Sequence, residues 1–155
     1  MPADAQLAEL GITLPEVPAP AGAYIPAVIS GTHVCTAGQL PFVSGQLAAT
    51  GKVGSGADLV TPEDAKRYAR LAAINALAAA RSVLGTLDRV TRVVKVVGFV
   101  ASDPAFTGQP GVINGASELL GEVFGPIGAH ARSAVGVAVL PLDAPVEVEL
   151  TLEFA

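Results

Sequence analysis

Aromatic residues and cysteine are scarce in this sequence. Its 155 residues include no tryptophan, and aromatic residues make up only 5% of the chain. The single cysteine, Cys35, has no second cysteine in the chain with which to form a disulfide, and no Cys/His cluster has the spacing of a metal site. We therefore expect a fold without internal disulfides, and we expect neither a metal ion nor an organic cofactor.

Charged residues are also few, and those of positive sign are scattered. The chain has nine Lys and Arg against fourteen Asp and Glu, and its net charge is −5. Because phosphate binding needs clustered basic side chains, we do not expect nucleic acid as a partner. No apolar run reaches the roughly 18 residues of a membrane-spanning helix, and residues 1–11 lack a basic-then-apolar signal pattern. We expect a cytoplasmic protein that does not bind membranes.

Small apolar residues make up most of what remains. Hydrophobic residues are 51% of the chain, and they are mainly alanine and valine, so the core must be built from small side chains that pack closely. The length fits one compact domain with a core of its own. A charged fraction of 15% is low for a monomer that must stay solvated, which favours an oligomer.

The first third of the chain is interrupted by proline and glycine. Residues 1–21 contain a short helical pattern followed by LPEVPAPAG, whose three prolines exclude a central strand or a helix. We interpret residues 1–21 as an N-terminal arm and residues 22–155 as a single domain. Residues 24–40 contain two β-type runs around Ser30-Gly31-Thr32, which predicts a hairpin. Residues 41–60 predict a long loop.

The rest of the chain alternates only partly between helix and strand. Thr61-Pro62-Glu63-Asp64 is a strong helix start, since Thr61 can cap and Pro62 suits the first helical position. Helical spacing continues to Gly85, which has the place of a terminating glycine. We expect strands over 90–100, 131–139 and 146–154 and a second helix over 112–124. This order predicts an α+β fold, in which two helices cover one face of a mixed β-sheet and the other face needs a partner.

Two stretches of the sequence resemble a known family. The first runs from GAY at 22–24 to AGQLP at 37–41, and the second is ARSAVGVA at 131–138, followed by Leu140-Pro141 and by VEVE at 146–149. These motifs are similar to those of the YjgF/YER057c/RidA family, whose members include imine deaminases and proteins described as endoribonuclease L-PSP. The chain differs from the usual pattern in having Ala37 where Ser is common, His130 where Pro is common and Ala134 where Cys is common.

The resemblance implies a fold, an assembly and a reaction. It implies the bacterial chorismate-mutase-like fold and a homotrimer, in which the open sheet faces line a barrel and three pockets lie at subunit interfaces. The implied reaction is hydrolytic deamination of small reactive 2-imino acids to 2-oxo acids and ammonia. Arg132 would bind the carboxylate of the substrate, and Glu147 would act with a water on the C=N bond. The remaining implied substrate-binding residues are Tyr24, Ala37, Gly38, Asn114 and Ala134.

Each of these side chains also has a structural alternative. Arg132 is a mid-strand charge that must be paired or functional, and it could simply pair with Glu147 or Glu149. Glu147 could belong to a solvent-facing stripe of period two. Tyr24 could be an ordinary half-buried tyrosine, and Asn114 an ordinary polar residue of a helix.

Two other functions stay open beside imine hydrolysis. The first is a non-catalytic module that binds a small carboxylate or a partner protein at the same pocket. The second is an endoribonuclease, for which the two histidines, His33 and His130, could serve as acid and base. His130 shares a face with Arg132, because residues i and i+2 of a strand point the same way, whereas His33 lies in the expected hairpin.

Overall fold

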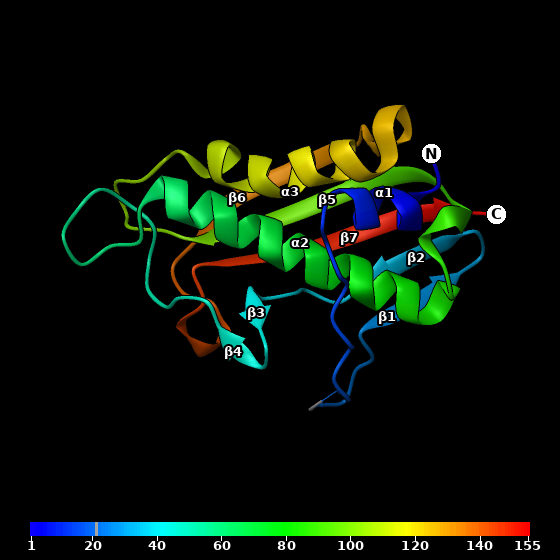
Figure 1. Ribbon diagram of the computed structural model, residues 1–155. Helices are drawn as coiled ribbons and strands as arrows, with labels where there is room; N and C mark the ends of the chain where they lie inside the picture. The colour runs from blue at the N-terminus through cyan, green and yellow to red at the C-terminus, as the bar shows by residue number, and fades with distance from the viewer. Residues whose placement is uncertain (21) are drawn as a thin grey trace.

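Five strands form one mixed sheet, and two long helices lie across one of its faces (Figure 1). The computed structural model describes residues 1–20 and 22–155. The helices and strands follow in the order α1 Ala3–Glu9, β1 Ala27–Ser30, β2 His33–Thr36, β3 Phe42–Val43, β4 Gln46–Leu47, α2 Pro62–Leu84, β5 Val90–Ala101, α3 Gln109–Phe124, β6 Ala131–Val137 and β7 Val146–Phe154. Short 3-10 helices are η1 Leu87–Arg89, η2 Gly125–Gly128 and η3 Pro141–Asp143.

The strands lie in the order β1-β2-β7-β5-β6, so the last strand in the chain occupies the middle of the sheet. Only β5 and β6 are parallel, and α3 connects them. The other neighbours are antiparallel. This arrangement confirms the predicted α+β class, with a mixed sheet and its two long helices on one face. The predicted loop over 41–60 is wrong in one part, because β3 and β4 form a small hairpin there, with positive φ at Ser44 and Gly45 at its turn.

Helix α2 begins and ends where its sequence signals place it. The hydroxyl oxygen of Thr61 accepts the backbone N–H of Asp64 at 3.1 Å, which satisfies one of the free amides of the first turn. Pro62 occupies that turn, where its missing N–H costs nothing. Gly85 follows the helix with φ at 83° and donates its N–H to Arg81, a backbone conformation that suits glycine.

Helix α3 begins three residues earlier than its sequence predicts. The segment Gly108-Gln109-Pro110-Gly111 looks like a loop, but the helix starts at Gln109 and takes Pro110 into its first turn. At the other end, Gly125 has φ at 61° and donates its N–H to Gly121, which ends the helix. The strand that follows, β6, ends at Val137 rather than at the predicted residue 139.

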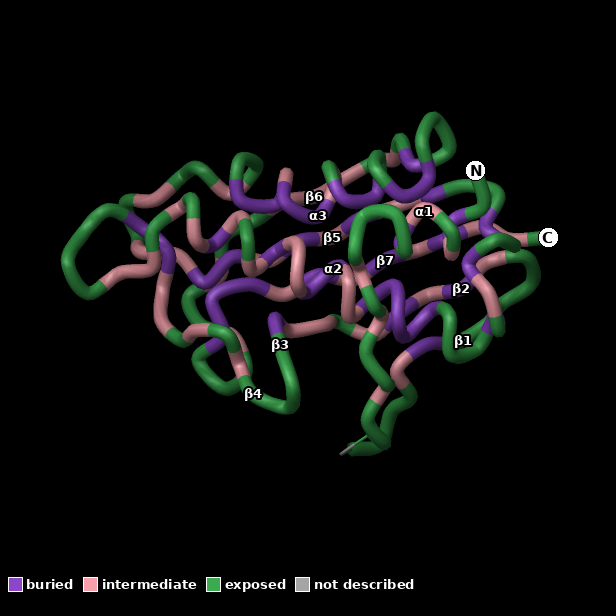
Figure 2. The backbone as a smooth tube through the Cα atoms, in the orientation of Figure 1, coloured by how far each residue is buried: buried purple, intermediate pink, exposed green. Residues whose placement is uncertain are grey.

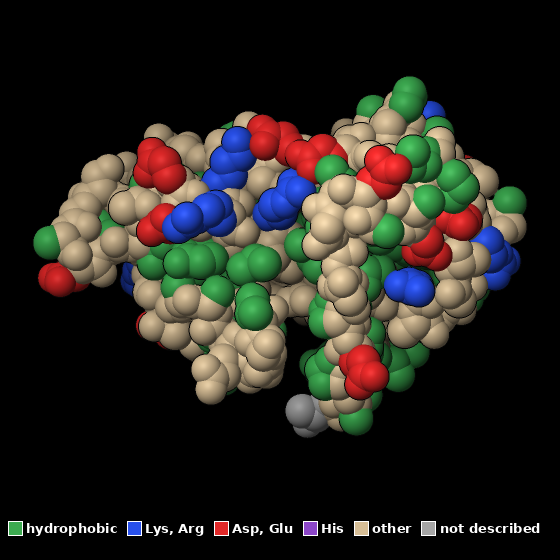
Figure 3. Space-filling view, viewed as in Figure 1, with side chains coloured by type: hydrophobic (Ala, Val, Ile, Leu, Met, Phe, Trp, Pro, Cys, Tyr) green, Lys and Arg blue, Asp and Glu red, His purple; other side chains and the backbone are tan. Residues whose placement is uncertain are grey.

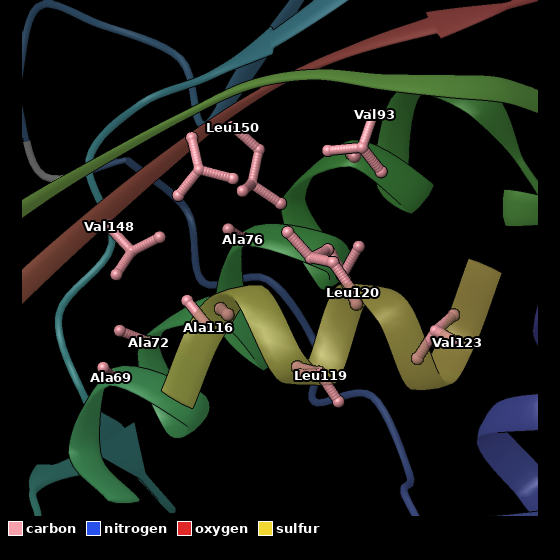
Figure 4. Close-up of a cluster of buried hydrophobic side chains, with 14 of the residues drawn as sticks. Ala69, Ala72, Ala76, Val93, Ala116, Leu119, Leu120, Val123, Val148 and Leu150 are labelled. Carbon is pink, nitrogen blue, oxygen red and sulfur yellow. The ribbon is translucent and has the colours of Figure 1, made fainter. Parts of the chain in front are cut away.

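Alanines of α2 and leucines of α3 meet valines and leucines of the sheet in one core (Figure 4). The buried tube segments in Figure 2 run along the facing sides of the two helices and the sheet. Small residues let the helices come close. A Cβ atom at Gly115 of α3 would overlap the carbonyl oxygen of Lys66 on α2, and one at Gly98 of β5 would lie 2.5 Å from Ile113. These contacts fix where α3 lies over β5 and β6.

Side chains of the central strand alternate strictly between the two faces of the sheet. Val146, Val148, Leu150 and Leu152 of β7 are buried beneath the helices. Glu147, Glu149, Thr151 and Glu153 therefore point to the other side, which we call the open face. Residues paired across neighbouring strands share a face, so Phe99 and Val97 of β5, opposite Glu147 and Glu149, also belong to it.

The outer surface of the helices carries charges of both signs (Figure 3). Ion pairs between Lys66 and Glu118 at 3.0 Å and between Arg70 and Glu122 at 2.8 Å join α2 to α3. Helix α1 adds to this layer by packing against α3 and η1, and it buries Leu7. In the parts of the chain that the structure describes, no helix is both long and apolar enough to cross a membrane.

Candidate functional site

Arg132 lies on the edge strand β6 and points toward α3. Its neighbour across the parallel pair is the buried Val96, so its side chain leaves the sheet on the helix-covered face. There its guanidinium donates from Nη1 to Asn114 Oδ1 at 2.8 Å and to Ser117 Oγ at 3.2 Å. It also donates from Nη2 to the carbonyl oxygen of Pro110 at 3.3 Å. Three positions of α3 thus hold one guanidinium.

These three acceptors are all neutral, so the positive charge of Arg132 is not compensated. Over residues 1–20 and 22–155, no carboxylate lies within ion-pair distance of it. A guanidinium has five N–H groups, and three are used here. The Nε–H and one Nη2–H are left for a ligand, and a carboxylate can accept two such bonds.

Structural pairing of Arg132 with Glu147 or Glu149 is therefore wrong. Strand alternation explains why. Arg132 is in register with Val96, which faces the helices, whereas Glu147 and Glu149 are on the open face. Strand β5 also lies between β6 and β7, so the acidic side chains cannot reach the guanidinium in the same chain.

A second set of hydrogen bonds lies beside Arg132. The ring of His130, just before β6, places Nε2 at 2.9 Å from Ser117 Oγ and Nδ1 at 2.6 Å from the carbonyl oxygen of Gly128. His130 is thus on the same side of the sheet as Arg132, as its spacing predicts. Ser117 was not among the residues that the sequence suggested. The one signal for it is its place three residues after Asn114, on the same face of a helix.

Glu147 lies on the open face of β7, against Gly38. A Cβ atom at Gly38 would be 2.6 Å from Glu147 Oε2, so glycine leaves the room that this carboxylate occupies. Burial raises the pKa of the Glu147 carboxyl above its ordinary value, and the negative charge of Glu149 raises it further. Both causes disfavour the charged form, which makes Glu147 a better proton acceptor than an ordinary surface glutamate.

Four of the other five candidate residues fall into two groups, one beside Arg132 and one beside Glu147. Asn114 and Ala134 lie with Arg132 at the β6 edge, and Ala134 packs against the core on the same face as Arg132. Gly38 lies with Glu147, and its neighbour Ala37 donates its N–H to Pro26 at 2.7 Å. Tyr24 precedes β1 and is 58% exposed. One chain therefore does not bring all seven together.

The two histidines also lie apart. His33 of β2 is paired with Glu153 and shares the open face with it, whereas His130 contacts Ser117 on the helix-covered side. A single chain thus offers no acid–base pair of histidines for cleavage of RNA. Among the described residues there is also no group of three His, Cys, Asp or Glu side chains that could hold a metal ion.

Known proteins resemble this chain over nearly its whole length. Residues 4–154 match the model of a family described as "YjgF/chorismate mutase-like, putative endoribonuclease". Protein TCP17 of Trypanosoma cruzi is 45% identical over 150 residues, which cover 96% of this chain and 92% of that protein. The crystal structure of Atu1372 from Agrobacterium tumefaciens is 44% identical, with a TM-score of 0.89 over 99% of this chain and 94% of that one. A Shewanella oneidensis structure is 32% identical, with a TM-score of 0.93 over 99% of this chain and 100% of that one.

Proposed function

Because this chain belongs to the YjgF/chorismate mutase-like family, we propose that it hydrolyses small 2-imino acids to 2-oxo acids and ammonia. The observation that carries the proposal is the uncompensated guanidinium of Arg132, held by three neutral oxygens. Such a cation needs an anion, and its two free N–H groups match a carboxylate. A 2-imino acid has a carboxylate next to an electrophilic C=N carbon.

Glu147 supplies the proton chemistry in this proposal. Water adds to the C=N carbon, the nitrogen takes up protons, and the C–N bond then breaks to leave a 2-oxo acid and ammonia. A carboxylate can accept the proton of the attacking water and return it to the nitrogen. The raised pKa of Glu147 supports this role, because proton transfer is most efficient when the pKa of the catalyst lies close to the working pH.

The pocket then needs two copies of the chain. Arg132 and Glu147 lie on opposite faces of the sheet, with β5 between their strands. We place the Arg132 group of one copy against the Glu147 group of another, in a homotrimer. Exposed apolar side chains on both edge strands support such contacts, among them Val28 and Ile29 of β1 and Val135 of β6, which is 44% exposed. An interface between copies of the chain would cover these side chains.

A non-catalytic carboxylate-binding module is the second candidate. It is favoured by the separation of Arg132 from Glu147 within one chain, since the Arg132 group alone can hold a carboxylate. The two candidates differ in rate and not in binding. A binding module would hold a 2-oxo acid through Arg132 without accelerating imine hydrolysis.

The deciding experiment measures binding and hydrolysis together. An imine generated in situ by an amino-acid oxidase is the substrate, and formation of the 2-oxo acid is followed while pyruvate affinity is measured by calorimetry. Arg132→Ala should weaken pyruvate binding about 30- to 1000-fold, the loss of a charge-assisted bidentate contact, and should lower the hydrolysis rate with it. Arg132→Lys keeps the positive charge but lacks the planar guanidinium that binds a carboxylate through two hydrogen bonds. It should therefore retain only part of the pyruvate affinity.

Arg67→Ala is the matched control, because Arg67 is an exposed arginine whose ion pair is with Asp64 on the surface of α2. It should leave both measurements unchanged. Binding through Arg132 without acceleration would select the binding module. If neither binding nor rate depends on Arg132, both candidates fail.

A further inference from the structure

A continuous chain of hydrogen bonds runs from the backbone at Gly128 through His130 and Ser117 to Arg132. We propose that Ser117 and His130 are positioning residues, which fix the guanidinium of Arg132 in the orientation that receives the carboxylate. This inference rests on the proposed function of Arg132. Neither residue is among those that carry the resemblance to the family, and position 130 is one where the chain departs from the usual pattern.

The direction of each hydrogen bond follows from the chemistry of its atoms. The carbonyl oxygen of Gly128 can only accept, so His130 Nδ1 carries the hydrogen of that 2.6 Å contact. In the neutral ring Nε2 is then an acceptor, and the Ser117 hydroxyl donates to it at 2.9 Å. With its hydrogen used in this way, Ser117 Oγ keeps its lone pairs for the N–H of Arg132 at 3.2 Å.

The anchor of this chain is rigid. Gly128 is buried in η2, and a Cβ atom there would overlap the carbonyl oxygen of Leu120 on α3. The backbone of η2 therefore passes directly against the helix that carries Ser117. His130 is held between the Gly128 carbonyl oxygen and Ser117 Oγ, both of which belong to packed backbone elements. The histidine ring in turn fixes the direction of the Ser117 hydroxyl.

A second helical serine, Ser82, illustrates the hydrogen bond that a serine hydroxyl makes when no histidine accepts its hydrogen. Ser82 of α2 donates its hydroxyl hydrogen to the carbonyl oxygen of Ala79 at 2.7 Å, the usual way in which serine satisfies itself within a helix. At Ser117, His130 takes the hydrogen instead. Its oxygen thus becomes a directed acceptor for the guanidinium, in place of a group bonded to its own helix.

The consequence for Arg132 is a fixed plane. Asn114 and Ser117 hold both hydrogens of Nη1, and Pro110 holds one of Nη2. The Nε–H and the remaining Nη2–H then keep one direction. Removal of the Ser117 contact leaves Nη1 held only by Asn114, and the guanidinium can turn away from the orientation that a carboxylate needs.

The test combines ligand affinity with a probe of the arginine itself. Pyruvate affinity is measured by calorimetry, and the side-chain N–H groups of Arg132 are followed by 15N NMR, assigned by their loss in Arg132→Lys. Ser117→Ala should weaken pyruvate binding about 3- to 10-fold, as expected for loss of one hydrogen bond. It should also broaden and merge the separate Nη signals of the held guanidinium, because rotation about the Cζ–Nε bond becomes faster once only Asn114 and Pro110 hold the group.

His130→Ala should have a smaller effect of the same kind, about 2- to 5-fold. Ser117→Ala should cost less in the His130→Ala background than in the wild type, because the two residues act through one contact. His130→Gln should recover much of the affinity, since its amide oxygen can accept the serine hydrogen. Ser82→Ala and His33→Ala are the matched controls and should leave both the affinity and the Arg132 signals unchanged.

The outcomes separate this inference from the proposed function. If pyruvate binds through Arg132 but Ser117→Ala and His130→Ala change neither affinity nor the Nη signals, the positioning role is wrong and the proposed function stands. Additive losses in the double variant would also overturn it. If the wild type binds no 2-oxo acid yet the Nη signals of Arg132 merge in Ser117→Ala, the positioning is supported and the proposed function fails.

Discussion

The β6 edge and the β7 centre of the sheet each carry one charged side chain that the proposed site needs, in opposite environments. At the edge, neutral oxygens surround Arg132 and leave its charge uncompensated. At the centre, Glu147 is partly buried near a second negative charge, which raises its pKa. The cation is held and ready to bind an anion, whereas the carboxylate is made readier to take a proton. Binding and proton transfer are thus assigned to different regions.

Glu147→Gln should have the largest effect, and it tests whether proton transfer and carboxylate binding belong to different regions. The amide keeps the shape of the side chain but removes the proton acceptor, so imine hydrolysis should fall about 100- to 10,000-fold. Pyruvate affinity, which depends on Arg132, should stay near the wild-type value. Glu153→Gln is the control, since Glu153 lies on the same face of β7 and donates nothing to the proposed chemistry. Equal losses of hydrolysis rate in Glu147→Gln and Glu153→Gln would contradict a particular role for Glu147.

A substitution at Gly115 can disturb the surroundings of Arg132 without changing a residue that contacts its guanidinium. Alanine there would press against the Lys66 carbonyl oxygen and shift α3, which carries three anchors of Arg132. We expect Gly115→Ala to cost about 1–3 kcal/mol of stability and to weaken pyruvate binding. Gly121→Ala, on the same helix but with open space around it, should instead stabilise by about 0.5–1 kcal/mol. Chemical denaturation measures the free energy of unfolding of both variants. An equal change in Gly115→Ala and Gly121→Ala would contradict the close contact between Gly115 and the Lys66 carbonyl oxygen.

Gly38→Ala should disturb the position of the Glu147 carboxylate and have a smaller effect than the Gly115 substitution. The new methyl group would overlap the place of Glu147 Oε2 and push the carboxylate aside. Because that group is the flexible end of a side chain, the fold should tolerate the change, and hydrolysis should fall about 10-fold for a small displacement of a catalytic group. Pyruvate binding should be unaffected. A rate equal to that of the wild type would separate Gly38 from the working position of Glu147.

The smallest effect concerns stability and pH. Since the pKa of Glu147 is raised by burial and then by Glu149, the folded protein holds this proton more tightly than the unfolded chain. Stability is therefore lost as pH rises from the ordinary carboxyl value near 4.5 through the raised pKa. Glu147→Gln should be more stable than the wild type above that range and equal to it below. Thermal unfolding across pH 4 to 8 checks the sign, and a gain confined to acid pH would contradict it.

Local signals in the sequence were enough for most of the fold. The capping residue Thr61 and the proline after it mark the start of α2, and the alternation of Val and Glu marks β7. Errors arose where local signals were ambiguous. Pro110 resembles a loop residue but also suits a first helical turn, and a hairpin of two-residue strands is too short for a period to be visible.

The surroundings of Arg132 could not be predicted in the same way. Its three anchors come from positions 15 to 22 residues earlier in the chain, and one of them is a backbone carbonyl that any residue would supply. Which face Arg132 occupies depends on its register with β5, and a shift of one residue would reverse it. The motif identifies the arginine, whereas its partners emerge only when α3 lies across the sheet.

The central place of β7 governs when this protein can fold. As the last strand of the chain, it joins the β1–β2 hairpin to the β5–β6 pair, and those two parts have no strand contact with each other without it. The two parts can be joined only after β7 has been made, and the apolar surface between them stays exposed until then. Closure of the sheet is thus a long-range step, which slows folding, and the strands that carry Arg132 and Glu147 belong to one sheet only once it is complete.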